Sequence, residues 1–254
     1  MSVDINEVMQ LVRETRQFVE NRDMAGHVQV KGLADYVTQV DTNIQNFLRE
    51  KLGELAPEVE FLGEEDGLHA MKGDTFWILD PIDGTTNLVH DYQHSTVSLG
   101  LYSKGEIILG VIYDPFREEM FYAEKGKGSF VNGRPIHVAE AENLGQTIIA
   151  IGTAPYQKEL APQNFACFQR VFEKCEDIRR TGSAAMDLAY TAAGRIGGYF
   201  EARLQPWDFA AGMLILTEAG GKITRYDGSE VNPVEPGGIV ATNGKLHEEL
   251  RALL

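Results

Sequence analysis

Hydrophobic positions along the chain follow two spacings, one typical of helices and the other of strands. Apolar residues recur at helical spacing, which predicts amphipathic packing helices, over residues 4–22 and 41–55. Asp4 or Asn6 is available to cap the first helix, and Asp41 to begin or cap the second. Compact or alternating apolar runs predict strands over residues 58–63, 76–79, 95–103, 107–113 and 119–124.

The pattern changes from about residue 146, where strand-like and helix-like segments alternate. Strands are expected over residues 147–152, 178–181, 197–202, 222–226 and 238–242, and helices over residues 164–175, 183–193, 207–219 and 245–254. Earlier strands follow one another directly, and Asn132-Gly133 favours a hairpin, so an antiparallel sheet is expected there. We therefore predict an N-terminal α+β lobe, residues 1–145, and a C-terminal α/β lobe, residues 146–254, packed as one compact unit.

One apolar run ends in the sequence Asp80-Pro81-Ile82-Asp83-Gly84, where we expect chemistry. Pro81 cannot donate to a sheet ladder, so pairing should stop where Asp80 begins. Both carboxylates and the Ile82 carbonyl can face one cation, and the polar residues after Gly84 look like a helix start that attracts an anion. A capped turn explains the same residues, so this stretch alone leaves a metal site and a loop as alternatives.

Further acidic residues accompany this stretch. Glu64 and Glu65 follow a predicted strand, Asp208 begins a predicted helix, and Asp35 precedes Asp41. Capping or a solvated strand end explains each of them in isolation. Together they supply oxygen ligands without Cys or His, which favours Mg²⁺, Mn²⁺ or Ca²⁺ and the hydrolysis of a phosphate monoester.

Composition narrows the class of partner. The chain has 254 residues, 43% of them hydrophobic, and a formal net charge of −15, which disfavours nonspecific binding to nucleic acid or to an anionic membrane. A small anionic substrate would need a cation to help it in, so Mg²⁺ is favoured over a basic pocket. Two cysteines, an N-terminus without a signal-peptide pattern and no membrane-length apolar run predict a cytoplasmic protein. His90 and His94 have no third ligand of matching position, so no zinc is expected.

Four motifs strongly resemble those of the inositol monophosphatase family of Mg²⁺-dependent, lithium-sensitive phosphatases. They are Asp35-Tyr36-Val37-Thr38-Gln39-Val40-Asp41, Gly63-Glu64-Glu65, the run from Trp77 to Asn87, and Pro206-Trp207-Asp208-Phe209-Ala210-Ala211-Gly212. The resemblance implies an α/β, five-layer αβαβα sandwich of the sugar phosphatase type and a homodimer. It also implies two to three Mg²⁺ ions per active site, for which Mn²⁺ can substitute.

The resemblance implies a role for each matching residue. The first metal would take Glu64, Asp80 and the Ile82 carbonyl, the second Asp80, Asp83 and Asp208, and a weaker third Glu64 with water. The catalytic residues would be Asp41, Glu64 and Thr85, of which Asp41 and Thr85 orient the attacking water. The substrate would meet Asp83, Gly84, Thr85, Gly182, Ser183, Ala184 and Glu201. Residues 181–184 would also cap and pack a helix.

The implied activity is Mg²⁺-dependent hydrolysis of a small polyol or sugar phosphate, inositol 1-phosphate above all, by in-line attack of a metal-activated water. Fructose 1,6-bisphosphatase, NADP phosphatase, 3′-phosphoadenosine nucleotide phosphatase and histidinol phosphatase have similar scaffolds and stay open as alternatives. A regulatory protein-binding module that kept the scaffold is another. Lys31 matches a mobile-loop lysine, but the stretch from Lys31 to Asp35 is one residue shorter than in the animal enzymes, which leaves its placement open.

Overall fold

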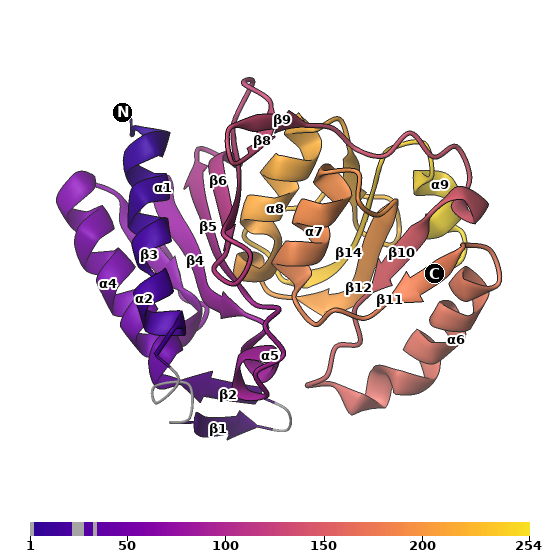
Figure 1. Ribbon diagram of the computed structural model, residues 1–254, viewed down its shortest axis with the longest axis horizontal. Helices are drawn as coiled ribbons and strands as arrows, with labels where there is room; N and C mark the ends of the chain where they lie inside the picture. Colours follow the sequence, from indigo (N-terminus) through magenta and orange to yellow (C-terminus); the bar gives the residue numbers. More distant parts are fainter. Residues whose placement is uncertain (1–2, 22–27, 33–34) are drawn as a thin grey trace.

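The computed structural model describes residues 3–21, 28–32 and 35–254, and they form five layers in the order α, β, α, β, α (Figure 1). The first layer contains α1 (Ile5–Glu14), α2 (Arg16–Val19) and α4 (Gln39–Leu55). The central layer contains α7 (Ala184–Ala192) and α8 (Pro206–Glu218), and the last contains α6 (Ala161–Phe172) and α9 (His247–Arg251). The expected αβαβα sandwich is confirmed.

The first sheet has seven strands in the order β3-β4-β5-β6-β7-β8-β9. Their bounds are β3 Glu60–Gly63, β4 Thr75–Asp83, β5 Thr96–Ser103, β6 Glu106–Asp114, β7 Glu119–Glu124, β8 Ser129–Val131 and β9 Arg134–Ile136. β3 and β4 are parallel and the other neighbouring pairs antiparallel, so the predicted antiparallel sheet is confirmed apart from its β3 edge. Asn132 and Gly133 both have positive φ at the predicted hairpin.

The prediction that strand pairing stops where Asp80 begins is wrong. β4 pairs with β5 at Asp80 opposite Ser98, shifts register, and pairs again at Asp83 opposite Thr96. The irregularity lies at Pro81, which has no N–H to donate, and the ladder resumes beyond it. Both aspartates are therefore fixed by a sheet.

The single helix predicted for residues 4–22 is two helices, with the break at Thr15. Asp4 caps α1 as expected, because its Oδ1 accepts the Asn6 N–H at 2.9 Å. The Thr15 hydroxyl instead donates to the Val12 carbonyl at 2.6 Å, a local bond that competes with the regular helix. The predicted end at Arg22 lies outside the described residues.

The second sheet has five strands in the order β11-β10-β12-β14-β13. Their bounds are β10 Ile148–Ile151, β11 Asp177–Arg179, β12 Gly198–Leu204, β13 Lys222–Thr224 and β14 Gly237–Thr242. β10 is parallel to both β11 and β12, so the carboxyl ends of these three strands meet at one edge. A short antiparallel pair, β1 (Val28–Gly32) and β2 (Asp35–Thr38), stands apart from both sheets.

The terminal helix is shorter than the predicted span of residues 245–254. α9 ends at Arg251, and the last two carbonyl groups of the chain accept hydrogen bonds from Arg170 on α6, Leu253 at 2.7 Å and Leu254 at 3.3 Å. These contacts hold the chain end against a neighbouring helix. No described helix is long and apolar enough to cross a membrane.

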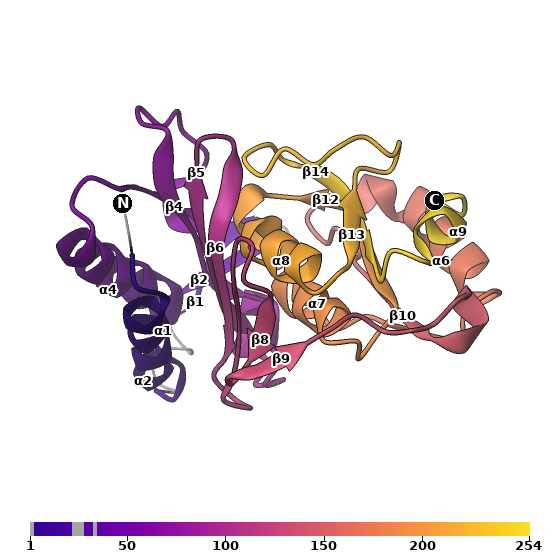
Figure 2. The same cartoon turned by 90° about the horizontal axis from the view of Figure 1, so that it is seen from above.

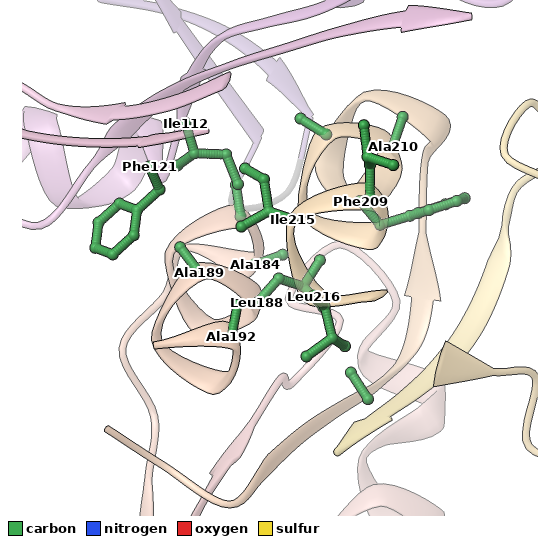
Figure 3. Close-up of a cluster of buried hydrophobic side chains, with 14 of the residues drawn as sticks. Ile112, Phe121, Ala184, Leu188, Ala189, Ala192, Phe209, Ala210, Ile215 and Leu216 are labelled. Atoms are coloured by element: carbon green, nitrogen blue, oxygen red, sulfur yellow. The ribbon is translucent and has the colours of Figure 1, made fainter. Parts of the chain in front are cut away.

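The largest buried cluster lies between the two sheets, around α7 and α8 (Figures 2 and 3). α8 is apolar on nearly every face because sheet strands and α7 surround it. Its backbone approaches β6 so closely that a Cβ at Gly110 would lie 2.7 Å from the Ala211 carbonyl oxygen. The cluster draws residues from both sides of position 145, and the division into two lobes stays a prediction.

Candidate active site

A cavity of about 710 Å³ lies where the central helices begin and β4 ends. All of the predicted metal-binding and substrate-binding residues line it, namely Glu64, Asp80, Ile82, Asp83, Gly84, Thr85, Gly182, Ser183, Ala184, Glu201 and Asp208. The remaining predicted residue, Asp41, lies behind Thr85 and is hydrogen-bonded to it. The structure therefore brings together residues that are far apart in the sequence.

Asp80 lies close to three other carboxylates of the cavity. It is 2% exposed, and its Oδ1 accepts the Ile82 N–H at 3.0 Å, which fixes its direction. Burial raises the pKa of Asp80 well above its usual value, and the nearby carboxylates of Glu64, Asp83 and Asp208 raise it further. These carboxylates repel one another when ionised, and a bound cation would relieve that repulsion.

Asp208 is held by the start of α8, as the sequence predicts. Its Oδ2 accepts the Gln205 N–H at 2.7 Å, which closes a capping box at a helix that begins with Pro206. Burial raises the pKa of Asp208 well above its usual value, followed by the charge of Asp83. The Asp208 side chain therefore both caps α8 and lines the cavity.

Asp83 links β4 to the start of α7. Its Oδ2 accepts both the Ser183 hydroxyl and the Ala185 N–H at 2.6 Å, while Ser183 also caps α7 as predicted. Burial raises the pKa of Asp83 to about 6, although these hydrogen bonds oppose the rise. The Ser183 hydroxyl lies 3.3 Å from that of Thr96, so a short polar chain positions Asp83 from behind.

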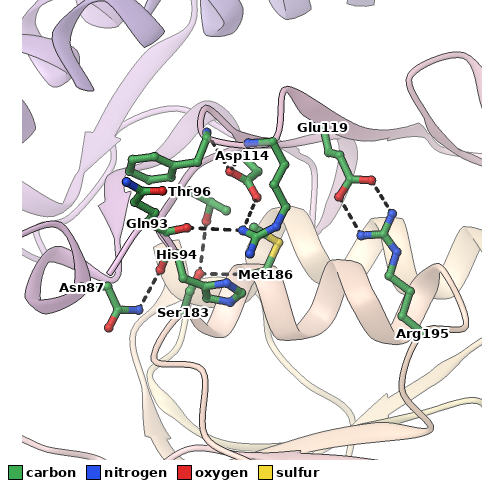
Figure 4. A network of polar contacts seen from close by, with 11 residues as sticks. Asn87, Gln93, His94, Thr96, Asp114, Glu119, Ser183, Met186 and Arg195 are labelled. Atoms are coloured by element: carbon green, nitrogen blue, oxygen red, sulfur yellow. Dashed lines mark hydrogen bonds and ion pairs between the residues drawn. The ribbon is translucent and has the colours of Figure 1, made fainter. Parts of the chain in front are cut away.

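The Asn87 side chain contacts the loop before β5 (Figure 4) and also the loop before α7. Its Nδ2 donates to the carbonyl of His94 at 2.7 Å and to that of Thr181 at 2.9 Å. Gly84 has φ 91°, and a Cβ there would lie 3.1 Å from the Gly182 carbonyl oxygen. A glycine therefore lets the start of α5 (Thr85–Val89) lie against the loop before α7.

Asp41 and Thr85 form a hydrogen-bonded pair. The Thr85 Oγ1 lies 3.1 Å from Asp41 Oδ1 and 3.0 Å from the Ile82 carbonyl oxygen, so its one proton can go to either acceptor. Asp41 is the third residue of α4, with Thr38 as the cap residue of the same capping box. Burial raises the pKa of Asp41 to about 6, although hydrogen bonds from Thr38 oppose the rise.

Glu201 lies in the cavity with both carboxylate oxygens already engaged. Oε1 accepts the Ala154 N–H at 2.7 Å, and Oε2 accepts the Tyr199 hydroxyl at 2.7 Å. Burial raises its pKa. Its first function is therefore to hold the loop after β10.

Sequence reasoning missed four charged residues of the cavity, Asp187, Lys158, Arg180 and Arg203. Asp187 is 2% exposed and its Oδ2 accepts the Thr181 hydroxyl at 2.8 Å. Its helical spacing from Ser183 could have placed it near the site. Arg203 lies on β12, Arg180 follows β11 and Lys158 belongs to the connection after β10, so the order of these strands brings the three cations to one cavity.

The donor set fits a hard divalent cation. Carboxylates and a carbonyl are the ligands that Mg²⁺ takes, and a cation would relieve the repulsion that raises the pKa of Asp80. Among the described residues, no group of three or more His, Cys, Asp or Glu side chains is placed so that it could hold a metal ion. The assignment of individual ligands is therefore a proposal. His94 is buried beside the Tyr190 ring, and no zinc is proposed.

Two residues named from the sequence cannot be placed in full. Asp35 lies on β2 and Lys31 on β1, but their side chains are outside the described part of the chain. The expectation for Lys31 stays open.

The fold and cavity agree with comparisons against known proteins. The family model described as the inositol monophosphatase family matches residues 3–254, and the chain belongs to this family of Mg²⁺-dependent phosphatases. The Nus factor SuhB of Escherichia coli K12 is 40% identical over 223 residues, covering 87% of this chain and 83% of the relative. The inositol-1-monophosphatase of Rhizobium meliloti is 38% identical over 240 residues, covering 94% and 89%. The crystal structure of the extragenic suppressor protein suhB from Bartonella henselae has a TM-score of 0.91 at 33% identity, covering 99% and 98%.

Proposed function

We propose that this chain is a Mg²⁺-dependent phosphomonoesterase of small polyol or sugar phosphates, with inositol 1-phosphate as the first substrate to test. The observation that carries the proposal is the crowding of Glu64, Asp80, Asp83 and Asp208 beside the Asp41–Thr85 pair. Family membership supports it, as does a solved structure of an IMPase/NADP phosphatase with Mg²⁺ and phosphate, 25% identical with a TM-score of 0.88.

The metal ligands would be the clustered carboxylates of the cavity and the Ile82 carbonyl. Glu64, Asp80 and the Ile82 carbonyl would hold one ion, and Asp80, Asp83 and Asp208 a second, with Glu64 available to a third. Bound Mg²⁺ would neutralise these carboxylates and draw charge from the phosphoryl oxygens. Asp80, Asp83 and Asp208 each accept a backbone N–H with one carboxylate oxygen, which fixes the direction of each side chain, and Asp80 is also hydrogen-bonded to the side chain of Glu64.

Asp41 and Thr85 would position the attacking water and take its proton. The Thr85 hydroxyl donates to the Asp41 carboxylate or to the Ile82 carbonyl, so its oxygen can accept a hydrogen bond from water. With a pKa of about 6, Asp41 is ionised at neutral pH and still a stronger base than an ordinary aspartate. The N–H groups of Gly84 and Thr85 start a helix and would receive phosphate oxygens.

The alcohol half of the substrate would meet Asp83, Ser183 and Glu201. The Ser183 hydroxyl already donates a hydrogen bond to Asp83, so the substrate would meet side chains that are held in place. Glu201 would accept a hydroxyl only in addition to its two protein partners, so we expect it to tune affinity more than rate.

A panel assay tests the proposal. Purified full-length chain is incubated with inositol 1-phosphate, fructose 1,6-bisphosphate, NADP, adenosine 3′,5′-bisphosphate and histidinol phosphate, and phosphate release is measured with Mg²⁺, with Mn²⁺ and with EDTA. We expect release that requires the metal and is inhibited by lithium. Absence of metal-dependent release from every ester would refute the phosphatase proposal.

A second, protein-binding role is raised by the relatives that carry the name Nus factor SuhB. Such a role need not use the cavity. The Asp80→Asn variant separates the two, because it should lose turnover and keep any surface interaction. If neither the wild-type chain nor the variant releases phosphate while both bind a protein partner equally, the binding role replaces the enzymatic one.

We also propose a homodimer, which rests on the family resemblance. Light scattering coupled to size-exclusion chromatography gives the mass directly, against 28.2 kDa for one chain. A monomer at micromolar concentration would contradict this proposal without affecting the chemistry.

A further inference from the structure

Asp187 is a buried carboxyl that the proposed mechanism does not use. It is the only charged residue of α7, it is 2% exposed, and it lines the cavity. Its Oδ2 accepts the Thr181 hydroxyl at 2.8 Å, whereas its Oδ1 has no hydrogen-bond partner among the described residues. A polar atom buried in this way destabilises a fold unless something offsets its lost contact with water. The position therefore calls for an explanation beyond helix packing.

The surroundings of Asp187 point to Thr181 as its main partner. Burial raises the pKa of Asp187 well above its usual value, and the hydrogen bond from Thr181 opposes the rise. The charged neighbours act in both directions, since Asp83 and Glu201 raise the pKa and Arg180 lowers it. Among the described residues, Thr181 is the only side chain hydrogen-bonded to the Asp187 carboxyl. The fixed contact of this carboxyl is therefore with the loop before α7.

The contact with Thr181 closes a ring of hydrogen bonds at the start of α7. The Thr181 hydroxyl oxygen also lies 3.5 Å from the Ser183 backbone nitrogen, and the Ser183 carbonyl accepts the Asp187 N–H at 3.1 Å. Gly182 lies between the two loop residues with φ 92° and has no side chain to hold it. Residues 181–183 are thus tied to a side chain one turn into the helix.

The same loop contacts residues that would bind the metal and the phosphate. The Ser183 hydroxyl donates to Asp83 at 2.6 Å, and the Thr181 carbonyl accepts a hydrogen bond from Asn87 at 2.9 Å. Asn87 belongs to α5, whose first N–H groups would receive phosphate oxygens. A shift of the loop would therefore disturb Asp83 and the start of α5 together.

We propose that Asp187 is a positioning residue of the active site, which fixes residues 181–183 through the Thr181 hydroxyl and thereby sets the direction of the Asp83 carboxylate. This rests on the proposed phosphatase function and adds to it a residue that would not touch the substrate. The acceptor oxygen carries the role, so an amide at position 187 should serve and an apolar side chain should not. A displacement of about 1 Å near reacting groups can lower a rate about a hundredfold.

Variants of the two partners test the contact. Asp187→Ala and Thr181→Val each remove one member of the hydrogen bond, and each should lower kcat for inositol 1-phosphate about tenfold at saturating Mg²⁺, with a smaller change in KM. The double variant should lose about as much as either single one, because all three lack the same contact. Asp187→Asn keeps an acceptor oxygen and should stay within about threefold of the wild type.

Thr191→Val is the matched control. The Thr191 hydroxyl is buried in the same helix and donates to the Asp187 carbonyl at 2.8 Å, and among the described residues it makes no hydrogen bond to the loop. Its removal should lower Tm and leave kcat within about twofold. A role of Asp187 in helix stability alone predicts that same pattern for Asp187→Ala. Thermal unfolding of each variant is measured alongside, and if Asp187→Ala does not fold, Thr181→Val decides.

Calorimetric titration of inorganic phosphate in the presence of Mg²⁺ separates this proposal from the phosphatase proposal. If no ester is turned over but Asp187→Ala and Thr181→Val bind phosphate about tenfold more weakly than the wild type, and Thr191→Val does not, the positioning role stands and the phosphatase proposal fails. If the wild type turns esters over and Thr181→Val keeps kcat within about twofold, the positioning role is overturned. Equal loss of kcat in Asp187→Asn and Asp187→Ala also overturns it. A wild type that neither turns over an ester nor binds phosphate contradicts both proposals.

Discussion

The cavity has an acidic side, formed by Glu64, Asp80, Asp83 and Asp208, and a basic side, lined by Lys158, Arg180 and Arg203, and the two sides differ in how their charges are balanced. On the acidic side, the buried Asp80 on β4 and the half-buried Asp208 on α8 have pKa values raised by their own desolvation and by neighbouring carboxylates. On the basic side, both carboxylate oxygens of Glu201 accept hydrogen bonds from the protein, and exposed cations such as Arg203 line the cavity. A bound cation would neutralise the carboxylates of the acidic side, whereas the basic side presents cations among the described residues that line the cavity. We expect the reaction to take place on the acidic side, where a bound cation would neutralise the carboxylates.

The largest effect should come from Asp80→Asn. Because Asp80 would bridge two metal ions, we expect kcat to fall at least about a thousandfold at saturating Mg²⁺. The metal-free variant should be more stable than wild type by about 1 kcal/mol, because one of the repelling charges is gone. Initial rates and urea unfolding measure the two effects. Asp74→Asn, an exposed aspartate at the start of the same strand, is the control and should change neither.

Removing the Thr85 hydroxyl should have the next largest effect. Thr85→Ala is expected to lower kcat about a hundredfold and to leave the Mg²⁺ dependence almost unchanged, because Thr85 contacts Asp41 and a carbonyl and would not bind the metal. Thr85→Ser keeps the hydroxyl and should recover most of the rate. If Thr85→Ala loses metal affinity and turnover to the same degree, Thr85 is structural.

The pH dependence of kcat follows from Asp41. Its pKa of about 6 lies above the usual value, so the carboxylate that accepts the proton forms as pH rises through that point. We expect kcat to increase up to about tenfold per pH unit below pH 6 and to level off above it. In Asp41→Asn this rising limb should disappear along with most of the activity. A rate that does not change between pH 5 and pH 7 would contradict the assignment of Asp41 as the base.

The stability of the metal-free chain should fall as pH rises. Asp41 and Asp83 have folded pKa values of about 6, above the ordinary 3.8, so folding favours their protonated forms. Their stabilising contribution is present near pH 4 and is lost as pH rises through about 6, on the order of 2–3 kcal/mol for each group at most. Mg²⁺ binds the ionised carboxylates, so it should raise Tm more at pH 8 than at pH 5. Thermal unfolding with EDTA and with Mg²⁺ measures both trends.

The smallest effect should come from Glu201. Glu201→Gln keeps an oxygen for the Ala154 N–H, and its amide can still pair with the Tyr199 hydroxyl. We expect KM for inositol 1-phosphate to rise less than tenfold, with kcat unchanged. Glu201→Ala leaves buried donors unpaired and should lower Tm as well. A large loss of kcat in Glu201→Gln would show that this residue takes part in the reaction and does not act on substrate affinity alone.

The pattern of the sequence predicts much of the fold because the central elements are buried on all faces. β4 and α8 contain continuous apolar residues, and the capping signals at Asp4, Ser183 and Asp208 mark helix starts that the structure confirms. The break at Thr15 depends on one local hydrogen bond. The register shift at Pro81 depends on a partner strand. Neither follows from spacing along the chain.

The acidic side of the site was also predictable, since its carboxylates directly follow strands or begin a helix. The basic side was not, because Lys158, Arg180 and Arg203 become neighbours only through the order of β11, β10 and β12. The net charge of the chain averages over the whole surface, so it favoured a metal and gave no signal for these three cations. The cavity contains cations in addition to the carboxylates suited to a metal.

Calorimetric titration of Mg²⁺ into the metal-free, full-length chain at pH 8 tests the central claim most directly, with inorganic phosphate present and Asp80→Asn measured in parallel. We expect at least two Mg²⁺ ions to bind to wild type, and the Asp80→Asn chain to lose most of that binding while keeping its fold. Equal Mg²⁺ binding by both chains, or no binding by wild type, would contradict the assignment of the acidic side as the metal centre.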